Sequence, residues 1–470
     1  MVFSSEVFLF GFLAVVLPLY FLCPKKLRNL WLFISSLVLF YAWDVPSYAL
    51  IMLFTITFDY FAGRLICHFH GIDKGAFARL TLIVTAIVNI GMLAFFKYTN
   101  LFISNINNLA DTGIPLLDIT LPIGISFYTF QTMSYVIDVY RKRCAVQRNF
   151  FDFGAYVTMF PQLIAGPIVR YVDVERELSE RHENFRDFGS GVKRFTYGLA
   201  KKILIANAMG EIWKEISAMA NPPVLTAWVG ALAFTFHIFF DFAGYSDMAI
   251  GMGKMMGFRF PENFDLPYIS RSITEFWRRW HMTLGTWFRE YVYIPLGGNR
   301  KGTKRQILNL LIVWGLTGFW HGASWNFALW GLYFGIILIL EKLFLLKLLE
   351  RLPRIISHIY TMLLVVLGWV IFANENFVEM ADYLRNLLTS PAGLYDGYTA
   401  FLLLSNLAVW LLAVVFSTSL PRNLGEKFSQ WQEKHKFLGI LEVVSVTALL
   451  LISIAFMVGG SYNPFLYFRF

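Results

Sequence analysis

The sequence predicts an all-α polytopic membrane protein with about ten to twelve transmembrane helices, together with re-entrant and interfacial helices. Hydrophobic residues make up 57% of the 470 residues and charged residues only 15%, whereas a soluble domain usually carries about 25% charged residues. The 48 phenylalanines are too many for one soluble core of this length. The third observation is a series of long apolar runs separated by basic loops.

The apolar runs give the expected helices in chain order. Several approach the roughly 20 residues that a helix needs to cross about 30 Å of hydrocarbon, and others are too short to cross alone. In the first run the positive charges follow the apolar core and no cleavage site stands out, which predicts a retained helix instead of a signal peptide. The runs lie at 6–22, 30–43, 48–62, 80–96, 121–139, 195–213, 224–250, 307–320, 325–346, 355–373, 400–420 and 437–459.

The basic residues are distributed very unevenly over the loops. Of the 40 lysines and arginines, only Lys97, Lys214, Arg385 and Arg469 fall in the alternate loops. The positive-inside rule then predicts that the basic loops are cytoplasmic and that the N-terminus is extracytoplasmic, in a multi-pass protein of the cell membrane. This topology accounts for the net charge of +9, so no nucleic-acid partner is expected.

We expect a single membrane-embedded domain over residues 1–470, because no separate soluble domain or internal repeat is evident. The polar stretch 171–194 mixes charges at helical spacing and predicts an interfacial helix followed by a Gly-rich turn. The apolar stretch 156–170 contains helix breakers and predicts a re-entrant segment that lines a cavity. Its breakers are Pro161, Gly166 and Pro167.

The region 254–305 is polar and basic, yet rich in aromatic residues. Ser272 and Glu275 have the spacing of a capping box, which predicts the start of a helix. A continuous helix from there would place a histidine on an aromatic face and its arginines elsewhere, low on the cytoplasmic side of the bundle. The residues expected on that face are Trp277, His281, Leu284 and Phe288, and those expected elsewhere are Arg278 and Arg289.

His321 lies between the short runs 307–320 and 325–340, and both flanking loops are basic. The two runs therefore predict a hairpin that dips into the membrane by about 21 Å, with His321 at its tip. An ionisable residue at that depth is a functional candidate, although a histidine can also simply tie two helices together. Small residues beside it (Gly318, Gly322 and Ala323) permit close approach of backbone or substrate. Ser324 and Asn326 can fix the ring tautomer or bind a polar substrate.

The remaining ionisable residues have simpler interpretations. His237 lies in an apolar run and is expected to hydrogen-bond a neighbouring helix, and the other histidines lie in or beside charged loops. The intramembrane acids can form a transporter-like proton relay, pair with nearby arginines or cap broken helices; they are Asp59, Asp138, Asp241 and Asp247. The three cysteines have no metal-ligand spacing, and no metal site is predicted.

Two histidine motifs resemble those of the membrane-bound O-acyltransferase superfamily, and in particular its alginate O-acetyltransferase branch. They are "FWRRWHMTLGTWFREYVYIPLGGNRKG" (276–302) and "GLTGFWHGASWNFALWG" (315–331). The similarity covers nearly the whole chain, and neither histidine departs from the pattern. Other stretches that agree are "LPIGISFYTFQTMSY" (121–135), "FPQLIAGPIVR" (160–170), "FDFAGYSDMAIG" (240–251) and "NPFLYFRF" (463–470).

The resemblance implies helices around a transmembrane tunnel and two signature histidines. His321, in the "WHG" motif, would be the catalytic one, and His281, in "RRWH", the second functional histidine. We expect the substrate-binding residues to be Trp280, Arg289, Trp320, Ser324 and Asn326. The activity implied is transfer of an acyl group, acetyl in this branch, from a cytoplasmic thioester such as acetyl-CoA to an exported, alginate-like polysaccharide. No tightly bound cofactor is expected, and the partner implied is an extracytoplasmic protein resembling a hydrolase or acetylesterase.

The chemistry leaves alternatives open. A neutral imidazole can take a proton from an acceptor hydroxyl as the hydroxyl attacks a thioester, or can itself carry the acyl group. His321 is expected to do one of these, and His281 to shape the donor entrance or orient the thioester. The rival functions are D-alanyl transfer to teichoic acid by a sister branch and, further off, a transporter or flippase.

Overall fold

In the computed structural model, residues 1–43, 45–164, 166–435 and 437–460 can be described, and no strand occurs in these ranges. The all-α class is therefore confirmed. The chain divides into two compact units, which are described separately. The first comprises Met1–Phe195 and Ser246–Pro261, and the second comprises Thr196–Tyr245 and Glu262–Phe470.

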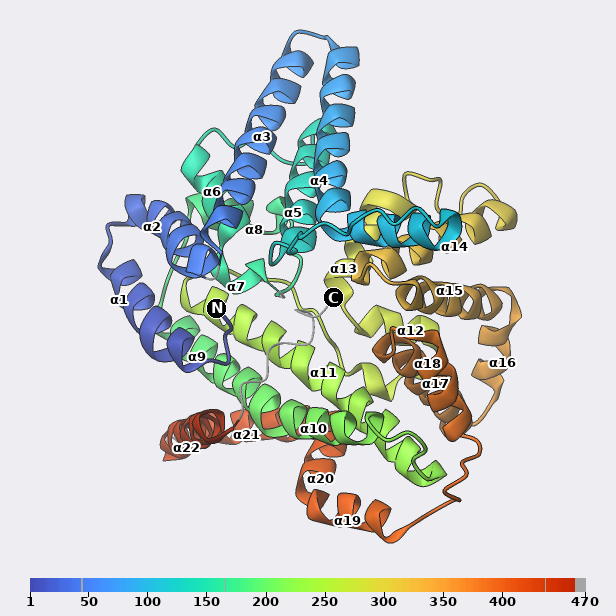
Figure 1. Ribbon diagram of the computed structural model, residues 1–470. Helices are drawn as coiled ribbons and strands as arrows, with labels where there is room; N and C mark the ends of the chain where they lie inside the picture. Colours follow the sequence, from blue (N-terminus) through green and yellow to red (C-terminus); the bar gives the residue numbers. More distant parts are fainter. Residues whose placement is uncertain (44, 165, 436, 461–470) are drawn as a thin grey trace. The chain divides into compact units, whose positions relative to one another are not determined.

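The first unit is built around the long antiparallel pair α3 and α4 (Figure 1). A buried carboxylate links the pair, because Asn89 Nδ2 donates a hydrogen bond of 2.8 Å to Asp59 Oδ1. The helices of this unit are η1 (Val7–Leu13), α1 (Ala14–Leu22), η2 (Lys25–Leu27), α2 (Arg28–Ile34), η3 (Ser35–Phe40), η4 (Tyr41–Trp43), α3 (Pro46–Gly71), α4 (Gly75–Ala110), α5 (Ile125–Tyr140), α6 (Phe150–Thr158), α7 (Phe160–Leu163), α8 (Tyr171–Ser179) and most of α9 (Phe185–Ala200).

The polar stretch 171–194 differs from its prediction. It contains α8 and the start of α9, and the glycines expected to form a turn lie inside α9. Gly191 is needed there for close packing: a Cβ at this position would come within 2.5 Å of the backbone oxygen of Gly251. Sequence reasoning treated these glycines as breakers, whereas Gly191 is a packing residue.

The stretch 156–170 has the irregular backbone that its prolines and glycine predict. Helix α6 ends at Thr158 and the short α7 begins at Phe160, and the side chains at this break are buried. Residue 165 lies outside the described ranges. Whether the segment re-enters a membrane or lines a cavity stays a prediction.

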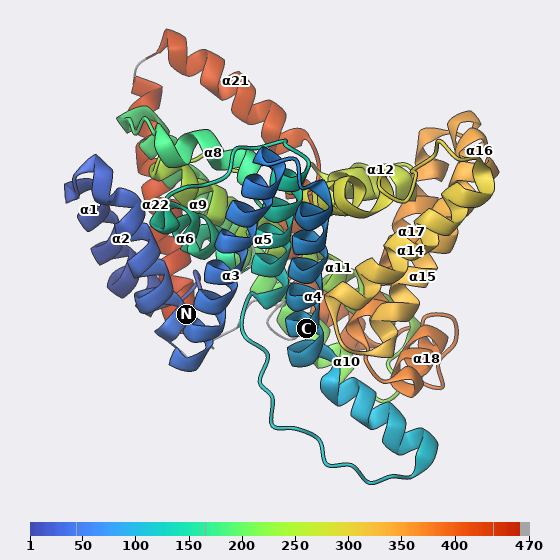
Figure 2. The ribbon, with the colours of Figure 1, turned by 90° about the horizontal axis from the view of Figure 1, so that it is seen from above.

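The second unit contains the other helices, and α14, α15 and α17 lie side by side in it (Figure 2). Its helices are η5 (Lys201–Ala206), α10 (Asn207–Ser217), the first part of α11 (Val224–Met255), η6 (Pro267–Ile269), α12 (Ile273–Arg279), α13 (Met282–Phe288), η7 (Arg289–Tyr293), α14 (Thr303–His321), α15 (Trp325–Leu340), η8 (Glu341–Leu345), α16 (Leu346–Arg351), α17 (Arg354–Ala373), α18 (Phe377–Asn386), α19 (Gly397–Ser405), α20 (Leu407–Phe416), α21 (Leu420–Lys434) and α22 (Phe437–Gly459).

Five helices in the described ranges are long and apolar enough to cross a membrane: α3, α4, α11, α17 and α22. The bent pair α19–α20, with 64° between its halves, would make a sixth. Other apolar runs form shorter helices; the first, for example, spans Val7–Leu22. The polytopic class is thus confirmed, while ten to twelve crossings stay a prediction.

The intramembrane acids pair individually. Besides Asp59 with Asn89, Asp247 lies 2.9 Å from Arg194 within the first unit. Asp241 lies 2.5 Å from Lys202 within the second unit, and both side chains are fully buried. The predicted pairing with arginine is confirmed for Asp247, whereas the partner of Asp59 is an asparagine and that of Asp241 is a lysine.

Candidate active site

The helix predicted through His281 is interrupted at that residue. Helix α12 ends at Arg279, and α13 begins at Met282. Between them Trp280 is extended and His281 adopts φ +44° and ψ +52°, in the left-handed region that non-glycine residues rarely occupy. The prediction of one continuous helix was wrong, because the left-handed residue turns the chain before α13.

The start of α12 agrees with its prediction. Ser272 Oγ accepts a hydrogen bond from the backbone N–H of Glu275, while the Glu275 carboxylate accepts from the N–H of Arg271. A second carboxylate, the fully buried Glu341, accepts from the N–H groups of Ile273 and Thr274 at 2.7 Å each. Glu341 follows α15, so it ties the helix that leads to His281 to the hairpin that carries His321.

Asn263 holds the break between α12 and α13. Its backbone oxygen accepts from Met282 N at 2.9 Å. Its side-chain oxygen accepts from Thr283 N at 3.3 Å and from Thr283 Oγ1 at 2.8 Å, and it lies 3.0 Å from His281 Nδ1. The first N–H groups of a helix have no partner within the helix. Asn263 therefore caps α13, although it lies outside that helix in sequence.

His281 is buried, with 2% of its surface exposed. Burial lowers the pKa of its imidazole to about 3, because an apolar environment disfavours the charged form. Its ring lies 4.7 Å from that of Phe242, edge to face. The imidazole is therefore neutral at physiological pH.

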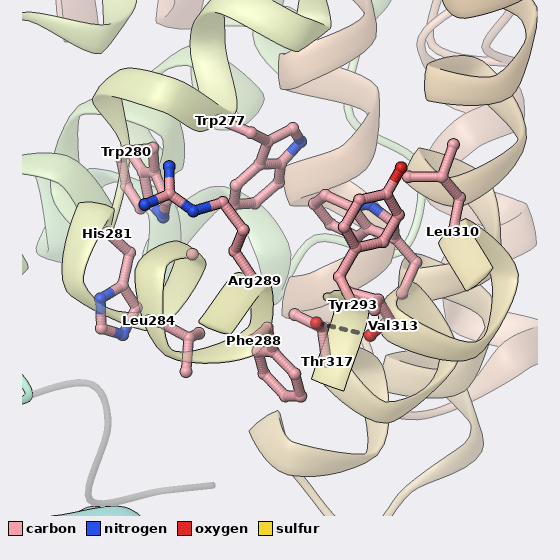
Figure 3. A pocket seen from close by; sticks show the side chains of 12 residues that line it. Trp277, Trp280, His281, Leu284, Phe288, Arg289, Tyr293, Leu310, Val313 and Thr317 are labelled. Atoms are coloured by element: carbon pink, nitrogen blue, oxygen red, sulfur yellow. Dashed lines mark hydrogen bonds between the residues drawn. The ribbon is translucent and has the colours of Figure 1, made fainter. Parts of the chain in front are cut away.

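A pocket of about 200 Å³ adjoins His281. Figure 3 shows His281, Leu284 and Phe288 on one side and Val313 and Thr317 of α14 on the other. The lining is mostly aromatic and aliphatic, with one arginine. The lining residues are Trp277, Trp280, His281, Leu284, Gly285, Phe288, Arg289, Tyr293, Leu310, Val313, Trp314 and Thr317.

Helices α14 and α15 form the predicted hairpin, with His321 as the last residue of α14. Two glycines allow these helices to pack closely: a Cβ on Gly318 would come within 2.3 Å of the backbone oxygen of Phe327, and a Cβ on Gly331 within 2.4 Å of that of Trp314. The close approach predicted at Gly318 is thus made by the neighbouring helix. His321 is buried at the hairpin turn, with 4% of its surface exposed.

Trp320 connects the two histidines. Its ring centroid lies 5.9 Å from that of His281 and 5.0 Å from that of His321. His321 also packs edge to face against Trp330 at 4.9 Å, and Trp330 contacts Trp277 of α12 at 5.5 Å. Two histidines 40 positions apart therefore belong to one aromatic cluster, and both are buried.

Comparisons with known proteins identify the family of this chain. Residues 142–348 match the family model of the membrane-bound O-acyltransferases, and both histidines lie in that range. The probable alginate O-acetylase AlgI of Pseudomonas aeruginosa is 45% identical over 380 residues, which cover 80% of this chain and 72% of that protein. This chain belongs to the membrane-bound O-acyltransferase family. It is therefore an O-acyltransferase and a multi-pass membrane protein.

Two further relatives show the range of the family. The peptidoglycan O-acetyltransferase of Helicobacter pylori is 33% identical over 424 residues, covering 83% of this chain and 80% of that protein. The teichoic acid D-alanyltransferase of Bacillus subtilis is 28% identical over 273 residues, covering 54% of this chain and 69% of that protein. The similarity to the O-acetyl-transferring relatives is therefore higher and covers more of this acyltransferase.

The other predicted substrate-binding residues of the acyltransferase fall into two groups. Trp280 and Arg289 line the pocket, and Arg289 also pairs with Glu290 at 3.1 Å. Ser324 and Asn326 were expected to bind substrate or fix the tautomer of His321. Ser324 directly precedes α15, and its side chain makes no capping hydrogen bond to that helix. Asn326 donates to the carbonyls of Ile371 and Phe372 and so ties α15 to α17.

Asn263 is the site residue that sequence reasoning missed. Nothing in the stretch "PENFDLPY" (261–268) distinguishes an asparagine that caps a distant helix from one in an ordinary turn. The simpler prediction for His237 was correct, since its Nδ1 lies 2.8 Å from the carbonyl oxygen of Ala206. The described residues contain no cluster of three potential metal ligands, and the expectation of no metal stays a prediction.

Proposed function

We propose that this acyltransferase moves an acetyl group from a cytoplasmic thioester, such as acetyl-CoA, to an exported cell-surface polysaccharide of the alginate type. The observation that carries the proposal is the pair of buried imidazoles, His281 and His321, on either side of Trp320. A pocket beside one of them is open to a small acyl group. The names of the two O-acetyl-transferring relatives support a polysaccharide as acceptor.

The residues suit this reaction. Transfer from a thioester to a hydroxyl needs a group that accepts the hydroxyl proton and a site that holds the acyl group away from water. Two buried imidazoles in an aromatic cluster suit both needs, since an imidazole can accept a proton or bind the acyl group covalently. We propose that His321 and His281 are both catalytic residues, with Trp280, Arg289 and Trp320 in contact with the substrates.

We propose that the basic loops face the cytoplasm and the N-terminus faces outward, in the inner or cytoplasmic membrane. The donor would then approach from the side that carries most lysines and arginines. The acceptor polymer would meet the site from the other side, through a tunnel, with the help of an extracytoplasmic partner that resembles a hydrolase or acetylesterase. The family resemblance supports these points.

The donor can be tested with the purified chain in proteoliposomes. We expect acetyl-CoA to release free CoA thiol when the acceptor polysaccharide and the partner are present, and a D-alanyl carrier-protein thioester to release none. Thiol release from the D-alanyl donor alone would favour the sister-branch activity. Movement of unmodified polymer with both thioesters intact would favour a flippase and contradict the proposal.

A further inference from the structure

We infer that Asn263 is a positioning residue that holds the proton of His281 on Nδ1, so that Nε2 accepts the proton of the attacking hydroxyl. This inference rests on the proposed function, because it assumes that His281 takes part in acyl transfer. It adds a residue outside both histidine motifs, and it names the atom of His281 that reacts.

The side-chain atom of Asn263 that faces His281 is the amide oxygen. An amide oxygen and an amide nitrogen are hard to distinguish by shape, so the hydrogen-bond partners must decide. The backbone N–H of Thr283 points at this atom from 3.3 Å, and a backbone N–H can only donate. The atom is therefore the oxygen, which also accepts from Thr283 Oγ1 at 2.8 Å.

This oxygen determines the tautomer of the His281 imidazole. His281 Nδ1 lies 3.0 Å from this oxygen, which can only accept, so Nδ1 carries a proton. A neutral imidazole has one N–H and one lone pair. Burial keeps the ring neutral, so Nε2 carries the lone pair. Nε2 is buried and has no hydrogen-bond partner among the residues that the structure describes.

Asn263 also holds the backbone at His281 rigidly. Asn263 bonds to three consecutive residues, His281, Met282 and Thr283, and is itself 1% exposed. His281 is held in the left-handed backbone region, which costs about 1–3 kcal/mol for a non-glycine residue. Such strain persists only where the surroundings fix it. The same four contacts thus fix both the backbone of His281 and its ring.

The tautomer decides which role His281 can fill. A thioester carbonyl or sulfur accepts hydrogen bonds, so orienting the donor would require an N–H. The Nδ1–H of His281 is already directed at Asn263, and Nε2 offers only a lone pair. His281 is therefore suited to take a proton from a hydroxyl, and not to orient the thioester as the sequence predicts. Acyl capture is then left to His321.

In the proposed acyl transfer, His281 Nε2 takes up one proton and then returns it. The hydroxyl oxygen of the acceptor attacks the acyl carbon while its proton moves to His281 Nε2. The bond from the acyl carbon to its carrier atom then breaks; this atom is the thioester sulfur or a nitrogen of His321. The carrier atom takes the proton back from Nε2, which leaves an ester, a free carrier and a neutral His281. While the proton is on Nε2, the Asn263 oxygen stabilises the His281 imidazolium by accepting a hydrogen bond from Nδ1–H. The negative charge that develops on the acyl oxygen also stabilises this imidazolium.

Three variants separate this role from a purely structural one. Asn263→Leu removes the acceptor, and Asn263→Asp keeps an acceptor for Nδ1–H and Thr283. Asn386→Leu is the matched control, because Asn386 is also buried but lies in α18. We expect Asn263→Leu to lower kcat about 10- to 100-fold, as is typical when a group that orients a histidine is lost. The apparent KM for acetyl-CoA should change little, and Asn386→Leu should keep wild-type kcat.

Asn263→Asp should retain more activity than Asn263→Leu but change the pH dependence. The added carboxylate favours the charged imidazole and raises the pKa of His281. Since activity requires the neutral ring, the variant should lose activity at a higher pH than the wild type as the pH falls. A structural role alone would leave the pH profile of this variant unchanged, and an unchanged profile would count against the inference.

The tautomer itself can be observed by ¹⁵N NMR of histidine-labelled protein, with the His281→Gln spectrum subtracted to identify the ring. We expect protonated Nδ1 and unprotonated Nε2 in the wild type and in Asn263→Asp. A proton on Nε2 in the wild type, or wild-type kcat in folded Asn263→Leu, would overturn the inference. If His281→Gln kept full activity, the proposed role of His281 would fail, while the NMR result would still decide whether Asn263 sets the tautomer.

Discussion

His321→Asn should reduce acetyl transfer by at least about 100-fold, because the amide can neither accept the proton nor carry the acyl group. His321 is buried at the end of α14, where the shorter asparagine fits within the same volume. The amount of folded, membrane-inserted protein should therefore be close to that of the wild type. The measurement is the initial rate of thiol release from acetyl-CoA in proteoliposomes.

The matched control for this prediction is His358→Asn. His358 is half-buried on α17, and its Nδ1 lies 3.0 Å from the carbonyl oxygen of Ser270. It lines a different pocket of the same unit from the one beside His281, so the variant should keep most of the activity. If folded His321→Asn turned over normally while His358→Asn did not, the catalytic role given to His321 would be wrong.

His281→Gln should lower kcat by about 100-fold or more, with little change in the apparent KM for acetyl-CoA, because the lone pair that accepts the proton is lost. A raised KM with unchanged kcat would instead match the donor-orienting role that the sequence predicts. The separate effects on kcat and KM therefore decide between the two roles of this histidine.

The same substitution has a pH-dependent effect on stability. Burial lowers the pKa of folded His281 to about 3, whereas the ring in the unfolded chain titrates near 6.5. Between these values the unfolded chain binds the extra proton, so this group makes the free energy of unfolding fall as the pH drops from about 6.5 to 3. In His281→Gln, thermal unfolding should depend less on pH in that range; an unchanged dependence would contradict the burial argument.

The hairpin around His321 and the start of α12 could be predicted because each depends on residues that are close together in the sequence. The short apolar runs on both sides of His321 give the hairpin, and Ser272 gives the start of α12. The break at His281 could not be read in this way, because "RRWHMTLG" has helical periodicity and contains no breaker before Gly285. That break depends on Asn263, which precedes it by 18 positions.

The packing role of Gly191 and the ion pair of Asp241 could not be predicted from the sequence either. From the sequence, Gly191 suggests a turn, but the structure shows that the backbone of Gly251 packs against it. Asp241 suggests a proton relay, but the structure shows an ion pair with Lys202. In each case the decisive neighbour is distant in the chain. Periodicity and capping signals describe contacts within a few residues, so they identify the helices but not their partners.

We propose that acetyl groups pass from a cytoplasmic thioester to a polymer on the opposite side of the membrane through this chain. The direct measurement uses oriented proteoliposomes with radiolabelled acetyl-CoA on the basic-loop side and the acceptor polysaccharide with the partner on the other. We predict label on the polymer in the wild type and none in His321→Asn. Label that reaches the polymer equally well in His321→Asn, or only when donor and acceptor share one side, would contradict the account.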